Sequence, residues 1–338
     1  MDVMAVVRAV HMAATVLTAG AFAFEFLVIR RAYAEEQASA CKDIERWLRL
    51  AGGWGVSLAL VSWLIWFALV AASMSGSPLG QALSAEVLHT VLTQTTFGQV
   101  WMLRFALMVL LGGELFLSRR RGSAARPALG PVGASLAVGL LVTLAWAGHA
   151  VGTERSVRPF HLTADALHLL GAGLWLGALI PLLLVLGRAR TSPAPAWHAL
   201  AATATRRFST LGVVAVVTLL VTGLINAWFL VGSFPALIDT SYGRLVSTKL
   251  ALFAIIVLIA AFNRVKLTPR LTADSNRDDM SQAALERLWR NVIAEICLGA
   301  IVIAIVGGLG TTPPSFHKHG PAQHHMHAGA ANHTEPES

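Results

Sequence analysis

The uninterrupted apolar stretch TLGVVAVVTLLVTGLINAWFLV, residues 210–231, decides the fold class of this chain because it carries no charged side chain. A helix of this length rises about 1.5 Å per residue and so crosses the roughly 30 Å hydrocarbon core of a bilayer. In lipid, a helix satisfies its own backbone hydrogen bonds. The stretch therefore predicts a transmembrane helix.

Similar apolar runs occur on both sides of it. We place eight transmembrane helices near residues 3–29, 50–72, 100–117, 128–150, 160–186, 210–231, 245–262 and 291–310. Of the 338 residues, 55% are hydrophobic and 13% are charged, whereas soluble domains carry about 25% charged residues. This composition excludes a soluble globular protein and predicts an all-α polytopic membrane protein.

Basic residues are concentrated in alternate connections between these runs. Most of the 26 lysines and arginines lie in the first, third, fifth and seventh connections. The positive-inside rule then places those connections in the cytoplasm and both termini outside, which for a bacterial inner membrane is the periplasm. The net charge of +8 indicates membrane lipids as partners and does not indicate nucleic acid; the sequence defines no oligomeric state.

The chain contains traces of an internal repeat. At an offset of 157 residues, His11, Gly20 and Gly55 match His168, Gly177 and Gly212; at an offset of 145, Thr95, Phe97, Gly98 and Arg104 match Thr240, Tyr242, Gly243 and Lys249. We therefore predict two parallel four-helix repeats, residues 1–150 and 151–312, related about an axis along the membrane normal. Coincidence within Gly- and Ala-rich helices is the alternative.

Four polar residues within this repeat are candidates for a structural or gating role. They are Arg104, Lys249, Tyr242 and Asn226. The two cations either snorkel to the interface or hold a carboxylate such as Asp165.

Histidines accumulate on the predicted outer side. The predicted topology places 11 of the 12 histidines there, together with several methionines. Imidazole is the commonest metal ligand in proteins, and thioethers favour cuprous ion. This mixture predicts binding of a copper ion, Cu(I) or Cu(II).

The sharpest candidate metal site is His161-x3-Asp165-x2-His168. Spacings of four and three place neighbouring members on one helical face. The ends of the motif are about 10 Å apart along a helix, so we expect two successive stations in place of one site. His11, Met12 and His149 are further candidate ligands. Hydrogen-bonded interhelical histidines and a capping aspartate are the structural alternatives.

Residues 313–338 contain four prolines and no apolar periodicity, which predicts a disordered periplasmic tail rich in His and Met. Its candidate metal ligands are His317, His319, His324, His325, Met326 and His327.

Several motifs of the second half resemble the bacterial copper resistance D (CopD) family. They are Arg207-Phe208-Ser209, Thr240-x-Tyr242-Gly243-Arg244-x4-Lys249, Asn263-Arg264 and Leu309-Gly310-Thr311-Thr312-Pro313-Pro314, so the resemblance is strongest over 205–312. It implies an inner-membrane copper-handling protein that moves copper from periplasm to cytoplasm with a periplasmic copper-binding partner of the copper resistance C type.

Three functional hypotheses remain open. The first is a copper transporter, without enzymatic activity and without a nucleotide-binding Gly-x4-Gly-Lys-Ser/Thr motif. The second is a membrane cytochrome or copper reductase in which His11, His149 and His168 ligate haem. The third is a metal sensor or scaffold that does not transport.

Overall fold

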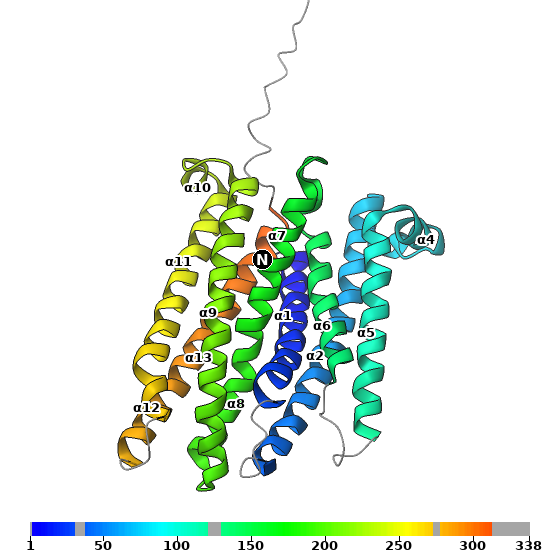
Figure 1. The fold of residues 1–338 in the computed structure, drawn as a ribbon. Coiled ribbons are helices and arrows are strands. Elements are labelled where there is room, and N and C mark those ends of the chain that lie inside the picture. The colour runs from blue at the N-terminus through cyan, green and yellow to red at the C-terminus, as the bar shows by residue number, and fades with distance from the viewer. Residues whose placement is uncertain (1, 31–37, 121–129, 273–277, 313–338) are drawn as a thin grey trace, which may run out of the picture.

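A computed structural model describes residues 2–30, 38–120, 130–272 and 278–312 of the chain. These residues form one bundle of long helices, and no strand occurs among them (Figure 1). The prediction of an all-α protein is therefore confirmed. The predicted tail, 313–338, lies outside the described residues, and so do its six candidate ligands.

The elements follow one another in the same general pattern in the two halves. The first half contains α1 (Val3–Phe24), η1 (Glu25–Ile29), α2 (Ala38–Ser75), α3 (Leu79–Ala82), α4 (Ala85–Gln94), α5 (Thr96–Arg120), α6 (Pro131–Val142), η4 (Thr143–Ala147) and η5 (His149–Gly152). The second half contains α7 (Arg158–Ala172), η6 (Gly173–Gly177), α8 (Ala178–Thr191), α9 (Pro195–Val231), α10 (Ala236–Asp239), α11 (Ser241–Phe262), η7 (Asn263–Leu267), α12 (Thr268–Thr272) and α13 (Asp278–Leu309).

Within the described ranges, seven helical stretches are long and apolar enough to cross a membrane. The predicted run at 128–150 does not qualify: its regular helix begins at Pro131, tightens into a 3₁₀ turn at Thr143 and ends at Gly148, whose backbone is extended. A membrane-spanning helix normally needs about 20 residues. The chain is thus a multi-pass helical membrane protein, with a shorter fourth apolar helix than the sequence predicted.

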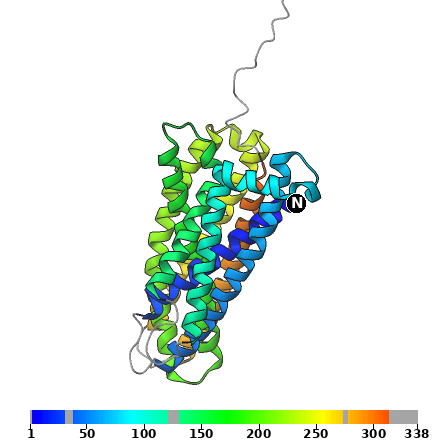
Figure 2. The same cartoon turned by 90° about the vertical axis from the view of Figure 1, so that its right-hand side faces the viewer.

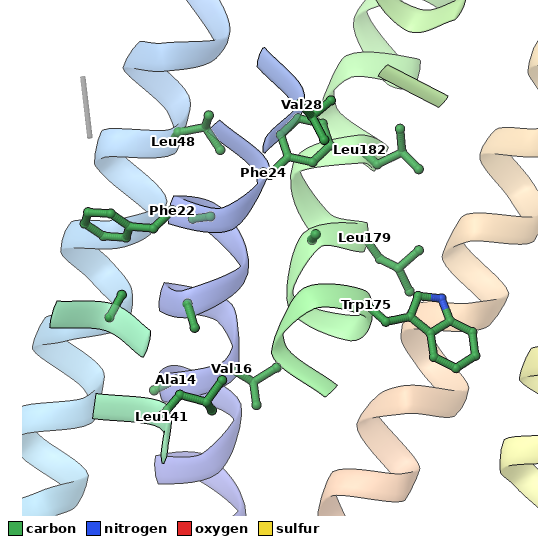
Figure 3. Close-up of a cluster of buried hydrophobic side chains, with 14 of the residues drawn as sticks. Ala14, Val16, Phe22, Phe24, Val28, Leu48, Leu141, Trp175, Leu179 and Leu182 are labelled. Carbon is green, nitrogen blue, oxygen red and sulfur yellow. The ribbon is translucent and has the colours of Figure 1, made fainter. Parts of the chain in front are cut away.

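The α1 helix forms the centre of the bundle. The lower part of α1 and η1 carries Phe22, Phe24 and Val28, which pack between Leu48 of α2 and Leu182 of α8 (Figure 3). These side chains are buried. Their burial beside two neighbouring helices explains why the first apolar run remains so rich in small and aromatic residues.

Both ends of the described chain lie at the same end of the bundle, visible in Figures 1 and 2. A β-carbon added to Gly307 would meet Ala5 and Ala9, and one added to Gly310 would meet the Arg8 guanidinium. The start of α1 therefore packs beside the end of α13. We call this the terminal end of the bundle, because the candidate site is built from it inward.

Candidate functional site

A buried polar centre in the first half is built around His11 of α1. The Arg104 Nη2 atom of α5 lies 2.6 Å from His11 Nε2, and His11 Nδ1 lies 2.9 Å from the Ser62 hydroxyl and 3.1 Å from the Ala59 carbonyl oxygen of α2. His11 and Arg104 are both fully buried. Arg104 also donates to the Leu140 carbonyl and the Thr143 hydroxyl.

These contacts fix the tautomer of His11. A guanidinium has donors and no acceptor, so Nε2 accepts the hydrogen bond from Arg104 and the ring proton resides on Nδ1. That proton faces the Ser62 hydroxyl and the Ala59 carbonyl oxygen. The lone pair that would bind a metal or haem iron is therefore already engaged, and His11 can become a ligand only if Arg104 moves.

The second half repeats this arrangement around His168 of α7. Its Nδ1 atom lies 3.0 Å from the Thr222 hydroxyl of α9, and its Nε2 atom lies 3.5 Å from Lys249 Nζ of α11. Thr222 donates its own proton to the Thr218 carbonyl. Thr222 therefore accepts from His168 Nδ1, and the Nε2 lone pair faces Lys249 across a long, weak contact.

A carboxylate accompanies His168 but has no equivalent beside His11. Asp165 lies one turn before His168 on α7 and accepts a 3.2 Å hydrogen bond from the Asn226 amide nitrogen of α9. Asp165 and Lys249 are also close enough for their charges to interact. The Asn226 amide oxygen is buried and has no hydrogen-bond donor, so the second centre offers acceptors to an incoming cation.

The other predicted ligands have separate surroundings. His149 Nε2 lies 3.0 Å from the Leu309 carbonyl oxygen, and the His149 ring is 6.0 Å from the ring of Tyr242. The Thr153 hydroxyl lies 2.6 Å from His161 Nδ1, and the His161 ring stacks on a phenylalanine. Met12 packs against the hydrophobic core. These residues cluster near the terminal end without sharing a ligand position.

No group of three or more His, Cys, Asp or Glu side chains is arranged to hold a metal ion in the described ranges. His161, Asp165 and His168 therefore do not converge on one point, as the helical spacing predicts. Haem ligation by His11 and His168 would require both Arg104 and Lys249 to move, because each cation faces the lone pair concerned.

The matched Thr-x-aromatic-Gly motifs have a structural role in both halves. The hydroxyl of Thr95 accepts from the Gly98 amide, and that of Thr240 accepts from the Gly243 amide, each at 2.9 Å. Each pair caps the start of a long helix, α5 or α11. A β-carbon at either glycine would overlap the preceding short helix. The motifs thereby set the depth of Arg104 and Lys249.

Sequence reasoning missed several residues around the first centre. The Arg8 guanidinium lies over the Trp66 ring, 4.7 Å from its centroid, and Trp66 contacts Trp101 with 4.9 Å between ring centroids. The offset of 157 that pairs His11 with His168 also pairs Arg8 with Asp165. Applying the repeat offset to every polar neighbour of His168 would have identified Arg8.

The motifs of the second half also meet at the opposite end of the bundle. Arg264 donates to the Ser209 carbonyl and hydroxyl at 2.9 and 2.8 Å. Asn263 donates to the buried carboxylate of Glu295 at 2.7 Å. These contacts tie η7 to α9 and α13, so the motifs are explained by packing between helices.

Two family models match the chain. The model described as Copper resistance protein D matches residues 202–309, and the model described as Copper resistance protein D-like, N-terminal domain, matches residues 1–158.

Three curated proteins are similar to the chain over most of its length. Copper resistance protein D of Pseudomonas syringae pv. tomato is 30% identical, over 78% of this chain and 81% of the relative. Inner membrane protein YebZ of Escherichia coli (strain K12) is 32% identical, over 72% and 78%. Copper transport protein CutJ of Bacillus subtilis (strain 168) is 26% identical, over 72% and 43%. No solved structure shows significant similarity to the chain.

Proposed function

Because the chain belongs to the copper resistance protein D family, we propose that it binds copper ions at the periplasmic side of the bacterial inner membrane and passes them inward to the cytoplasm. The family supports copper handling in a membrane. The direction of movement and the residues that bind the ion are part of the proposal.

The observation that carries the proposal is the acceptor cluster of the second half. The Asp165 carboxylate, the unpartnered Asn226 amide oxygen and the His168 Nε2 lone pair face a region that Lys249 contacts only weakly. Buried acceptors without a donor are costly unless a cation or donor reaches them. A nitrogen and oxygen donor set suits Cu²⁺ better than Cu⁺.

Residues nearer the terminal end form the proposed mouth of the path. His161 and His149 lie close enough for electrostatic interaction, and Tyr242 interacts in the same way with Asp165. Copper would pass from the tail histidines to this mouth and then to Asp165 and His168. A separate periplasmic copper-binding protein of the copper resistance C type would deliver the ion to the tail.

The proposed orientation has eight membrane crossings with both termini in the periplasm. The packing of Gly307 beside Ala5 and Ala9 supports an even number of crossings, because it holds the start of α1 and the end of α13 together. The fourth crossing would be the short helix Pro131–Ala147. The arginine-rich connections support a cytoplasmic location for the opposite end.

The proposed energy source is the membrane potential together with cytoplasmic trapping of the ion. A potential of 100 mV, negative inside, favours inward movement of a cation by about 2.3 kcal/mol per charge. Uptake by this mechanism needs no nucleotide.

Copper uptake into proteoliposomes tests the proposal. Vesicles containing the full chain, with an imposed inside-negative potential, should accumulate copper at least tenfold faster than vesicles containing Asp165→Asn. The matched control is His198→Ala, because His198 is exposed and lies on a different part of α9. Equal uptake by all three proteins, or none by the wild type, would contradict the proposed transport.

A further inference from the structure

The first half contains four buried N–H groups for which no acceptor is present in the described residues. They are Arg8 Nε, Arg104 Nε, Trp66 Nε1 and Trp101 Nε1, contributed by α1, α5, α2 and α5 respectively. Arg8 stacks on Trp66, Trp66 packs edge-on against Trp101, and the Arg104 guanidinium lies 5.8 Å from the Trp101 ring centroid. The four donors therefore belong to one cluster, which we call the donor cluster.

The two guanidinium groups of the donor cluster have no acidic partner in the part of the chain that the structure describes. Arg104 bonds only to neutral acceptors, namely His11 Nε2, the Leu140 carbonyl and the Thr143 hydroxyl. Arg8 makes one long hydrogen bond of 3.4 Å to the Ala147 carbonyl. A buried cation is normally paired, because removing it from water without a counter-charge costs several kcal/mol.

A comparison with the second half explains why a cation is not the missing partner. Ser62 contacts His11 as Thr222 contacts His168, an offset of 160 between α2 and α9. The same offset places Trp66 opposite Asn226, and the offset of 157 places Arg8 opposite Asp165. The carboxylate and the amide oxygen that attract a cation in the second half are thus replaced by a guanidinium and an indole N–H.

We propose that the donor cluster binds a small monovalent anion of the halide class. Arg104 and Trp101 are fully buried and Trp66 is 1% exposed, so the enclosed position favours a small ion without bulky substituents. Indole and guanidinium N–H groups are strong donors to anions when water is excluded. One halide partly neutralises two guanidinium groups and supplies the acceptor that the four donors lack.

The test is a halide titration of the full chain, purified in detergent and equilibrated in gluconate. Chloride and bromide should raise the temperature of thermal unfolding by several degrees and saturate, while gluconate or sulfate at equal ionic strength should not. Bromide should also quench tryptophan fluorescence with the same saturation curve, because Trp66 and Trp101 line the cluster.

Three variants make the result specific. Trp66→Phe keeps the ring but removes its donor, and Arg8→Gln removes one charge at the edge of the cluster; each should weaken the apparent halide affinity at least tenfold. Arg244→Gln, an exposed arginine on α11, should leave it unchanged. A response that is not saturable, that sulfate or gluconate reproduces, or that both cluster variants retain would overturn the proposal and indicate that water fills the cluster.

Discussion

Gly20 of α1 and Gly177 at the end of η6 pack directly against each other, so a β-carbon on either residue would overlap the backbone at the other. These glycines are also paired by the repeat offset of 157. Equivalent residues touch each other only near the axis that relates two repeats. The contact therefore supports the proposed two-fold arrangement and places its axis between α1 and the α7–α8 segment.

Gly20→Ala should destabilise the bundle by about 1–3 kcal/mol, because the added methyl group forces two closely packed helices apart. The measurement is thermal unfolding of the detergent-purified protein, followed by circular dichroism. Gly113→Ala is the matched control, since a β-carbon there meets nothing within 4 Å and alanine favours the helix. Equal stability of the two variants would show that Gly20 does not hold the halves together.

Lys249→Gln should raise the copper affinity of the second half at least tenfold. Lys249 lies 3.5 Å from His168 Nε2 and interacts with the charge of Asp165, so it competes with the metal for both. Two unit charges about 4 Å apart interact by about 4 kcal/mol at an effective dielectric constant of 20. Competition titrations with a copper chelator would measure the change; a weaker affinity in the variant would identify Lys249 as part of the binding site.

His11→Ala should cost about 1–3 kcal/mol of unfolding free energy, because it removes the acceptor that the buried Arg104 Nη2 uses. Copper binding should remain unchanged. Denaturant unfolding and copper titration on the same preparation separate the two effects. Loss of copper without loss of stability would show that His11 is a ligand after all.

Removal of residues 313–338 should lower the number of copper ions bound with high affinity while leaving the bundle folded. The tail carries six candidate ligands, and His-rich segments bind copper without a folded scaffold. Equilibrium dialysis of the full and shortened chains gives the comparison. An unchanged stoichiometry would assign no collecting role to the tail.

Hydrophobicity in the sequence was sufficient to predict the helices, because lipid imposes helical structure on each long apolar run. The length of the fourth helix was predicted wrongly, since Thr143 tightens the chain into a 3₁₀ turn and Gly148 ends it although the apolar composition continues. The repeat offset paired Gly55 with Gly212. The contacts of Ser62 and Thr222 with the two histidines instead place α2 and α9 at an offset of 160.

The candidate site was less predictable than the helices. Helical spacing placed Asp165 and His168 on adjacent turns, but only the packing of α9 brings Asn226 and Thr222 to them. Whether a lone histidine faces a metal site or a cation depends on neighbouring helices, which spacing along one helix does not define. The sequence therefore identified His11 as a candidate ligand without its buried partner Arg104.

Copper stoichiometry of matched variants tests most directly the claim that the two halves differ in chemistry. In the full chain, His168→Ala combined with Asp165→Asn should bind one copper ion fewer than the wild type, since the acceptor cluster would be lost. His11→Ala should bind the same number as the wild type. Loss of one ion in His11→Ala, or an unchanged number in the His168 and Asp165 variant, would contradict the assignment of copper to the second half.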